Sequence, residues 1–312
     1  MIRYLTHKEI DRSRWDACIS AAENRRVYAF SWYLDIVSPG WEALVEEDYH
    51  AVMPLTVKSR LGIRYLYQPY FAQQLGVFSG DHADTVRMRA FLSAVPIHFR
   101  HVDIHLNHAN ILQDEDNGIS SRINCELPLS ATYDDIFRGY SQNCRRNLRK
   151  AADHGVKPIA AAGIDSLVAL FRENYGRKEG KLGDEHYRTL IRLLQECTVR
   201  CGGKVEAASA TSDTPDAAAF MLPDNGRWYF LFAASSMEAR KNGAMFYLAD
   251  RFISLHAGQP VILDFEGGND LQLRRFYAGF GASEVPYGVL SYSRLPAAAR
   301  GAVSIVRKLR KY

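Results

Sequence analysis

Two carboxylates, Asp264 and Glu266, stand directly after the apolar run at residues 261–263. The run is too short for a helix and is typical of a strand that is buried on both faces. Gly267 and Gly268 follow and free the backbone to turn. Ligands of α/β sheets tend to bind at the carboxyl ends of strands, where a carboxylate can take a proton from a substrate amine. We therefore predict Asp264 and Glu266 as candidate bases; the alternative is that they only cap a helix and support the turn.

The elements around these carboxylates follow local signals. Asn269 or Asp270 can cap a short helix that ends near Gly281, a residue suited to a left-handed cap. Upstream, residues 227–234 predict a strand and residues 244–257 a helix. Tyr229 in that strand and Tyr247 in that helix are candidates for a proton relay, with a role as core aromatics as the alternative.

A basic stretch lies on a helix predicted for residues 141–154, which Gly155 ends. Its cations Arg146, Arg149 and Lys150 are the groups that would hold a phosphate or a carboxylate of a substrate. The alternative is a solvated helix face with a few weak surface ion pairs.

The stretch at residues 66–78 combines four aromatic residues and three glutamines around one proline. Aromatic faces together with amide groups are typical of a binding cleft. We expect Trp32, Tyr67, Gln68 and Tyr70 to line a cleft for the acceptor substrate between two domains. The alternative is an ordinary loop that its aromatic residues hold on the core.

Composition limits the classes of protein to consider. The chain has 312 residues, of which 47% are hydrophobic and 24% charged, as in globular proteins. The net charge of +4 is too small to indicate nucleic acid by itself. The first residues predict no signal peptide and no apolar run is long enough to cross a membrane, so we predict a cytoplasmic protein. Neither the five cysteines nor the histidines have metal-ligand spacing, so we predict no metal.

The order of predicted elements is strand, helices, antiparallel strands, helix, strand. It occurs once up to about residue 106 and again from about residue 125. Asn225-Gly226 predicts a tight hairpin in the second copy. We predict an α/β (α+β) fold with two tandem domains, residues 1–122 and 123–312, each a mixed, mostly antiparallel sheet flanked by helices. A basic amphipathic helix at residues 297–311 ends the second domain.

Three sequence segments point to a known superfamily. They are Asn143-Cys-Arg-Arg-Asn-Leu-Arg-Lys-Ala-Ala-Asp-His-Gly-Val156, Asp264-Phe-Glu-Gly-Gly268 and Arg275-Phe-Tyr-Ala-Gly-Phe-Gly-Ala282. With them, residues 125–292 resemble the acyl-CoA N-acyltransferase (GNAT) superfamily, in particular its tandem branch. That branch includes FemABX-like aminoacyltransferases and acetyltransferase-like proteins. The resemblance implies two GNAT-like domains.

The resemblance also implies an activity. It is transfer of an acyl or aminoacyl group to an amine of a small-molecule or cell-wall-precursor (peptidoglycan) acceptor. Arg240, Lys241 and Gly243 stand where the superfamily binds the pyrophosphate of acyl-CoA, but the usual glycine pattern is missing. Acyl-CoA and aminoacyl-tRNA both remain candidate donors, and no other cofactor is indicated.

Two alternatives to the acyl-CoA enzyme remain open at this point. One is a tRNA-dependent, FemABX-like aminoacyltransferase, which the basic helix and the basic residues 307–311 favour. The other is a binding protein that keeps the fold without catalysis. The C-terminal basic helix is also suited to peripheral contact with an anionic membrane.

Overall fold

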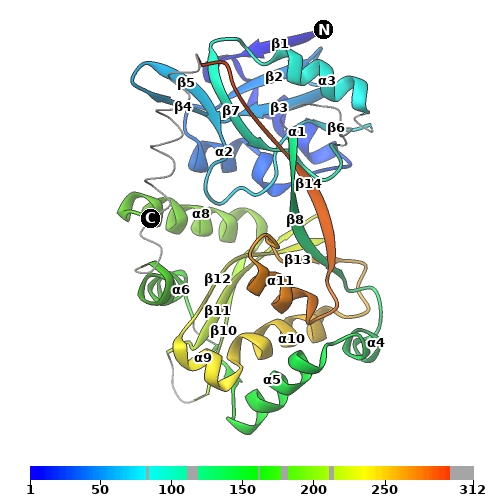
Figure 1. The fold of residues 1–312 in the computed structure, drawn as a ribbon, viewed down its shortest axis with the longest axis vertical. Coiled ribbons are helices and arrows are strands. Elements are labelled where there is room, and N and C mark those ends of the chain that lie inside the picture. Colours follow the sequence, from blue (N-terminus) through cyan, green and yellow to red (C-terminus); the bar gives the residue numbers. More distant parts are fainter. Residues whose placement is uncertain (82–83, 111–118, 161, 177–181, 211–213, 296–312) are drawn as a thin grey trace. The chain divides into compact units, whose positions relative to one another are not determined.

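The structure is a computed structural model that describes residues 1–81, 84–110, 119–160, 162–176, 182–210 and 214–295 (Figure 1). The chain divides into two compact units. Unit 1 comprises Met1–Arg122 together with the segment that begins at Pro286, and unit 2 comprises Ile123–Val285. The sequence-based division placed everything after residue 122 in the second domain. The last described strand, residues 283–293, instead belongs to unit 1 from Pro286 on, and its residues 289–293 pair with a strand of that unit.

Unit 1 contains two sheets. The first has the antiparallel order β1-β2-β3-β6 and the second contains β4-β5-β7-β14. Their bounds are β1 (Ile2–Leu5), β2 (Glu42–Glu46), β3 (Ala51–Leu55), β4 (Val57–Arg60), β5 (Ile63–Tyr67), β6 (Phe78–Ser79), β7 (Phe99–His105) and β14 (Ser283–Ser293). The main helices are α1 (Arg12–Ala21), α2 (Ser31–Val37) and α3 (Thr85–Ala94). Leu44, Met53, Leu66, Phe91 and Val102 belong to the core that joins the strands to α3.

Unit 2 is a sheet in the order β8-β13-β12-β11-β10-β9 with helices on both faces (Figure 1). Its strands are β8 (Ile119–Pro128, the first residues of which precede unit 2), β9 (Lys157–Pro158), β10 (Lys204–Ser209), β11 (Ala217–Asp224), β12 (Arg227–Ser235) and β13 (Ile262–Asp264). Its helices are α4 (Tyr133–Arg138), α5 (Gln142–Asp153), α6 (Ile164–Phe171), α8 (Asp184–Cys201), α9 (Met237–Asn242), α10 (Ala244–His256) and α11 (Leu271–Ala278).

Local signals begin and end several of these elements as predicted. The Asp270 carboxylate accepts hydrogen bonds from the Gln272 and Leu273 amides and so caps α11. Ser141 caps α5 in the same way. Asn225 and Gly226 both have positive φ between β11 and β12, as the predicted tight hairpin requires.

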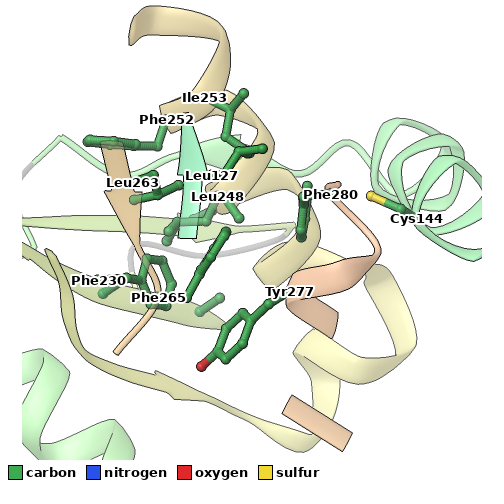
Figure 2. Packing of buried hydrophobic residues seen from close by; sticks show 14 of the residues in the cluster. Leu127, Cys144, Phe230, Leu248, Phe252, Ile253, Leu263, Phe265, Tyr277 and Phe280 are labelled. Atoms are coloured by element: carbon green, nitrogen blue, oxygen red, sulfur yellow. The ribbon is translucent and has the colours of Figure 1, made fainter. Parts of the chain in front are cut away.

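Aromatic packing fixes the segment after β13 to the core of unit 2. Phe265 stacks on Tyr277 with ring centroids 4.6 Å apart, and Phe280 is fully buried beside Phe276 and Tyr140. Figure 2 shows Phe265, Tyr277 and Phe280 in one cluster with residues of β12, β13 and α10. Burial of such rings stabilises a fold strongly. The position of the turn after β13 therefore depends on α11.

The two units share one arrangement of a parallel strand pair. In unit 1, β5 pairs in parallel with β7, and the last matched residues are Tyr67 and Asp103. In unit 2, β12 pairs in parallel with β13, and the last matched residues are Tyr229 and Asp264. The connection between the two strands contains a helix in each case: β6 and α3 lie between them in unit 1, and α9 and α10 in unit 2. The repeated order of elements predicted from sequence thus extends to the register of the strands.

Within the described ranges, no helix has the length and hydropathy needed to cross a bilayer. The basic helix predicted for residues 297–311 lies outside the described residues.

Candidate functional site

Asp264 is the most deeply buried carboxylate among the described residues of unit 2. Its side chain is fully buried and accepts hydrogen bonds from the Asn124 amide (2.9 Å), the Arg227 guanidinium (2.8 Å) and the Glu266 backbone N–H (3.0 Å). Its nearest strand partners are Glu126 of β8 and Tyr229 of β12. Asp264 therefore connects β8, β12 and the turn that follows β13. Its role as a base stays a prediction.

Arg227 is the cation that balances this cluster, and the sequence analysis did not single it out. Its Nη1 lies 2.8 Å from both Asp264 Oδ2 and Glu126 Oε1. Burial by itself lowers the pKa of the Arg227 guanidinium, but the two carboxylates outweigh burial and raise this pKa. The three residues come from β8, β12 and β13, so the ion pairs connect three neighbouring strands of the sheet.

The turn after β13 places Glu266 beyond the buried cluster. Glu266 has φ of +58°, a left-handed conformation that costs a non-glycine residue energy. The hydrogen bond from its N–H to Asp264 helps to hold that conformation. Gly268 follows, and an added Cβ there would lie 2.9 Å from the Ile123 carbonyl, so the turn fits closely against β8. Glu266 is partly exposed, unlike Asp264.

The parallel pair β12–β13 separates at this point. β13 ends at Asp264, opposite Tyr229, whereas β12 continues to Ser235. Residues 230–235 of β12 therefore extend past the end of β13, and residues 231–233 are partly exposed. A strand that extends beyond its parallel neighbour presents backbone donors and acceptors along one edge, which suits the binding of an extended ligand.

The two helices that carry the predicted cations, α5 and α9, are in contact. Lys150 Nζ donates a hydrogen bond to the Arg240 carbonyl at 3.2 Å, which joins α5 to α9. We call Arg146, Arg149, Lys150, Arg240 and Lys241 the basic group. Arg146, Arg149, Arg240 and Lys241 are exposed. Their separation by about 90 residues in sequence hid this proximity, whereas the fold brings them together.

Gly243 is needed for packing in the structure. It has φ of +79° between α9 and α10, and an added Cβ would lie 2.5 Å from the Asn147 carbonyl of α5. The helix α5 thus approaches the first turn of α10 closely. The predicted role of Gly243 in cofactor binding stays a prediction, and the structure explains this glycine by backbone conformation and helix contact.

The corresponding strand pair of unit 1 is closed. Past Tyr67, the Gln68 side chain accepts a hydrogen bond from the His105 N–H (2.8 Å) and donates one to the Ala72 carbonyl (2.6 Å). Leu75 then forms a parallel bridge to Leu106. The glutamine-rich loop therefore continues the pairing along β7. The Gln68 amide oxygen makes the contact with β7, and its NH2 group holds the loop through the Ala72 carbonyl.

The other predicted acceptor-binding residues of unit 1 lie near this loop. The Tyr67 ring is half-buried below the Lys58 ammonium, which lies 4.2 Å from its centroid. Tyr70 is 49% exposed beside Phe71. Trp32 packs edge-on against Tyr33 of α2, and the Tyr33 hydroxyl donates to the Phe71 carbonyl. These contacts connect α2 to the loop.

His105 lies at the end of β7 in this region and is one of the histidines for which we predicted no metal. Its Nδ1 lies 2.9 Å from the Gln73 carbonyl. Burial lowers the pKa of the His105 imidazole to about 4, and the Arg122 charge acts in the same direction, against the Gln73 hydrogen bond and Asp103. The ring is therefore neutral near neutral pH.

Acidification from about pH 7 to about pH 4 is expected to remove about 3 kcal/mol of stability from unit 1 through His105. The unfolded imidazole has a pKa of 6.5 and the folded one a pKa of about 4. Between these two pH values the unfolded chain binds a proton that the folded chain does not. The stability that His105 contributes is therefore complete above about pH 6.5 and is lost as the pH falls towards about 4. Urea unfolding of the wild type and of His105→Asn at both pH values measures it. Equal acid sensitivity of the two proteins would contradict the prediction.

A surface hollow of about 430 Å³ lies between α6 and the start of α8. Arg172 in its wall pairs with Asp184 at 2.6 Å and lies over the Tyr187 ring. These charges balance one another within the hollow, so we give it no role in the site.

Much of the site lies in a segment that is similar to a known protein family. Residues 138–270 match the family model described as an acetyltransferase (GNAT) domain. This segment contains the basic group, residues 230–235 of β12 and two members of the Asp264 cluster, Asp264 and Arg227, whereas Asn124 and Glu126 precede it. A search of curated proteins finds no match.

Solved structures extend the comparison to the whole chain. FemX matches with a TM-score of 0.62 and 14% identity over 92% of this chain and 96% of that chain. The C-terminal domain of a putative lysylphosphatidylglycerol synthetase from Agrobacterium fabrum matches with a TM-score of 0.55 and 10% identity, over 94% of both chains. L-PGS from Bacillus licheniformis matches with a TM-score of 0.54 and 12% identity, over 88% and 90%.

The chain thus has a tandem GNAT fold of the FemABX-like type. The predicted fold class is confirmed, and so is the resemblance stated from the sequence. At identities of 10–14%, these similarities show the fold alone. The activity has to be inferred from the residues of the site.

Proposed function

We propose that the protein is an N-acyltransferase that moves an acyl or aminoacyl group to an amine, with the donor bound on unit 2. The observation that carries the proposal is that β12 continues past the end of β13 and leads directly into α9, which contacts α5 and carries part of the basic group. An acyl donor could lie along residues 230–235 and place its phosphates on the cations of α5 and α9. The equivalent strand pair of unit 1 is closed by Gln68 and Leu75.

The chemistry requires a proton acceptor and an oxyanion donor. The acceptor amine loses a proton as it attacks the acyl carbonyl, and Glu266 at the end of β13 is our candidate base. Asp264 orients this residue through the Glu266 N–H. A backbone N–H of β12 would stabilise the negative charge that develops on the carbonyl oxygen. Tyr229 is fully buried at the level of Asp264, and we keep it as a candidate relay.

A tRNA-dependent transferase is the second candidate, because α5 packs closely against Gly243, where the superfamily would bind the pyrophosphate of acyl-CoA. A compact pyrophosphate is bound by free amides at a helix start that ligand phosphates can approach closely. Here α5 lies against Gly243, while the cations are exposed along two helices. Such a spread of cations suits a nucleic-acid backbone, as in aminoacyl-tRNA. For the acceptor, a cell-wall precursor remains our proposal, and one fold neighbour is named for a lipid product, lysylphosphatidylglycerol.

Donor binding tests the proposal. Acetyl-CoA and an aminoacyl-tRNA are titrated against the wild type and Arg240→Ala, with melting temperature and filter retention as readouts. We expect one donor to bind, and Arg240→Ala to weaken it about fivefold to tenfold through loss of a phosphate contact. If tRNA is the donor, affinity also falls steeply with salt.

Arg192→Ala is the matched control, because Arg192 is an exposed cation of α8 in the same unit. Its loss should leave donor affinity unchanged. Binding of neither donor would overturn the transferase assignment and favour a binding protein that keeps the fold.

A further inference from the structure

His105 ends β7 at the closed strand pair of unit 1, and two glutamines of one loop fix it. The Gln68 side chain accepts a hydrogen bond from the His105 backbone N–H at 2.8 Å, and the Gln73 carbonyl lies 2.9 Å from the His105 Nδ1. The Leu75 N–H also donates to the His105 carbonyl at 3.0 Å. Backbone and ring are therefore both held in place by the loop.

The contact with Gln73 determines which ring nitrogen carries the proton. A carbonyl oxygen can only accept a hydrogen bond, so Nδ1 must be the donor. In the neutral ring Nε2 then carries the lone pair. Within the described part of the chain, Nε2 makes no hydrogen bond, and the atom is not shut off from solvent. The result is a fixed hydrogen-bond acceptor on a half-buried ring.

The surroundings of this acceptor are polar and aromatic. The Tyr287 ring lies 5.7 Å from the imidazole. Asp103 and Tyr67 are register partners two residues before the end of β7, so their side chains share the face of His105. Val102 and Ile104 point to the other face, into the core of unit 1. A few oriented polar groups beside aromatic rings are typical of a subsite for a small polar ligand.

We propose that His105 is a binding residue of unit 1, whose Nε2 accepts a hydrogen bond from a neutral hydroxyl or amide N–H group of the acceptor substrate. The ligand's identity as the acceptor rests on the proposed transferase function, whereas the binding site itself does not. Hydroxyl groups would come from a sugar and amide groups from a peptide, so the two sources have to be distinguished.

Nitrogen NMR of the histidine rings tests the site without any activity. N-acetylglucosamine and the dipeptide alanyl-alanine serve as the two probes, added to the full chain. We expect the Nδ1–H tautomer at His105 and a change in its Nε2 resonance with one of them. His154 is the control ring, because its Nδ1 has the same kind of carbonyl contact, with Lys150, but it is exposed on unit 2.

Two variants separate binding from loop structure. His105→Asn keeps a donor near Nδ1 for the Gln73 carbonyl and removes the Nε2 acceptor, whereas His105→Gln carries an amide oxygen that reaches the Nε2 position. In the transfer assay we expect His105→Asn to raise the KM of the acceptor about tenfold with kcat nearly unchanged. His105→Gln should have a KM close to that of the wild type.

The experiments distinguish failure of the proposed subsite from failure of the proposed transferase function. An Nε2 resonance that responds to neither probe at high concentration, or the opposite tautomer, overturns the proposed subsite whatever the activity of the protein. A response at Nε2 in a protein that transfers no acyl group keeps the subsite and overturns the transferase function. An unchanged KM in His105→Asn of an active enzyme also overturns the subsite.

Discussion

Replacement of Arg227 by methionine is expected to lower the free energy of unfolding by about 3–5 kcal/mol. The variant leaves two carboxylates, the fully buried Asp264 and the 9% exposed Glu126, without their common cation. Uncompensated charge in a site with little water is costly, because neither desolvation nor mutual repulsion is offset. We expect the strands β8, β12 and β13 to loosen first. Urea unfolding and amide hydrogen exchange in these strands measure the effect.

A matched ion pair on the surface provides the control. Arg251 is 37% exposed and lies 3.4 Å from Glu206, so Arg251→Met should cost no more than about 1 kcal/mol. A triple variant that adds Asp264→Asn and Glu126→Gln to Arg227→Met should recover much of the lost stability, because the unpaired charges are then gone. A loss below about 1 kcal/mol in Arg227→Met would contradict our account of this cluster.

Replacement of Glu266 by glutamine is expected to lower kcat of the proposed transfer reaction about 100-fold or more. Glutamine keeps the size and hydrogen bonding of the side chain but cannot take the proton of the attacking amine. The backbone N–H of residue 266 still donates to Asp264, so the turn should persist. Steady-state kinetics with the donor identified above measure the effect, and the melting temperature of the variant checks the fold.

Glu284→Gln is the control for loss of a negative charge in the same unit, since Glu284 is 49% exposed and pairs with Arg274 at 3.5 Å. It should leave kcat unchanged. An unchanged kcat in Glu266→Gln would show that another group takes the proton, and Asp264 and Tyr229 would then be the next residues to replace.

Local features of the site followed from the sequence because each depends on a few neighbouring residues. The apolar run before Asp264 predicts the strand, the two glycines predict the turn, and Asn269 or Asp270 predicts the start of α11, where Asp270 is the residue that caps the helix. The Asn225-Gly226 hairpin is similarly local. Capping, turn conformation and side-chain periodicity all act over one or two turns of backbone, so they can be recognised without the fold.

The partners of these residues were decided by the tertiary structure. Nothing near Arg227 in sequence indicates Glu126 or Asp264, because the pairing depends on the register of three strands that are far apart in the chain. The glutamines of residues 66–78 illustrate the same limit. Their composition predicted a cleft, which stays a prediction, but it did not indicate that Gln68 accepts a hydrogen bond from the His105 N–H at the end of β7.

The tandem α/β architecture and the position of the acidic turn were therefore predictable from the sequence. The three-dimensional arrangement was needed to see that pairing of β12 with β13 ends at Asp264, whereas a loop extends the corresponding pairing in unit 1. This difference arises because buried polar groups must find partners. In unit 1 a loop supplies those partners along β7, whereas in unit 2 β13 ends at Asp264 and β12 continues beyond it.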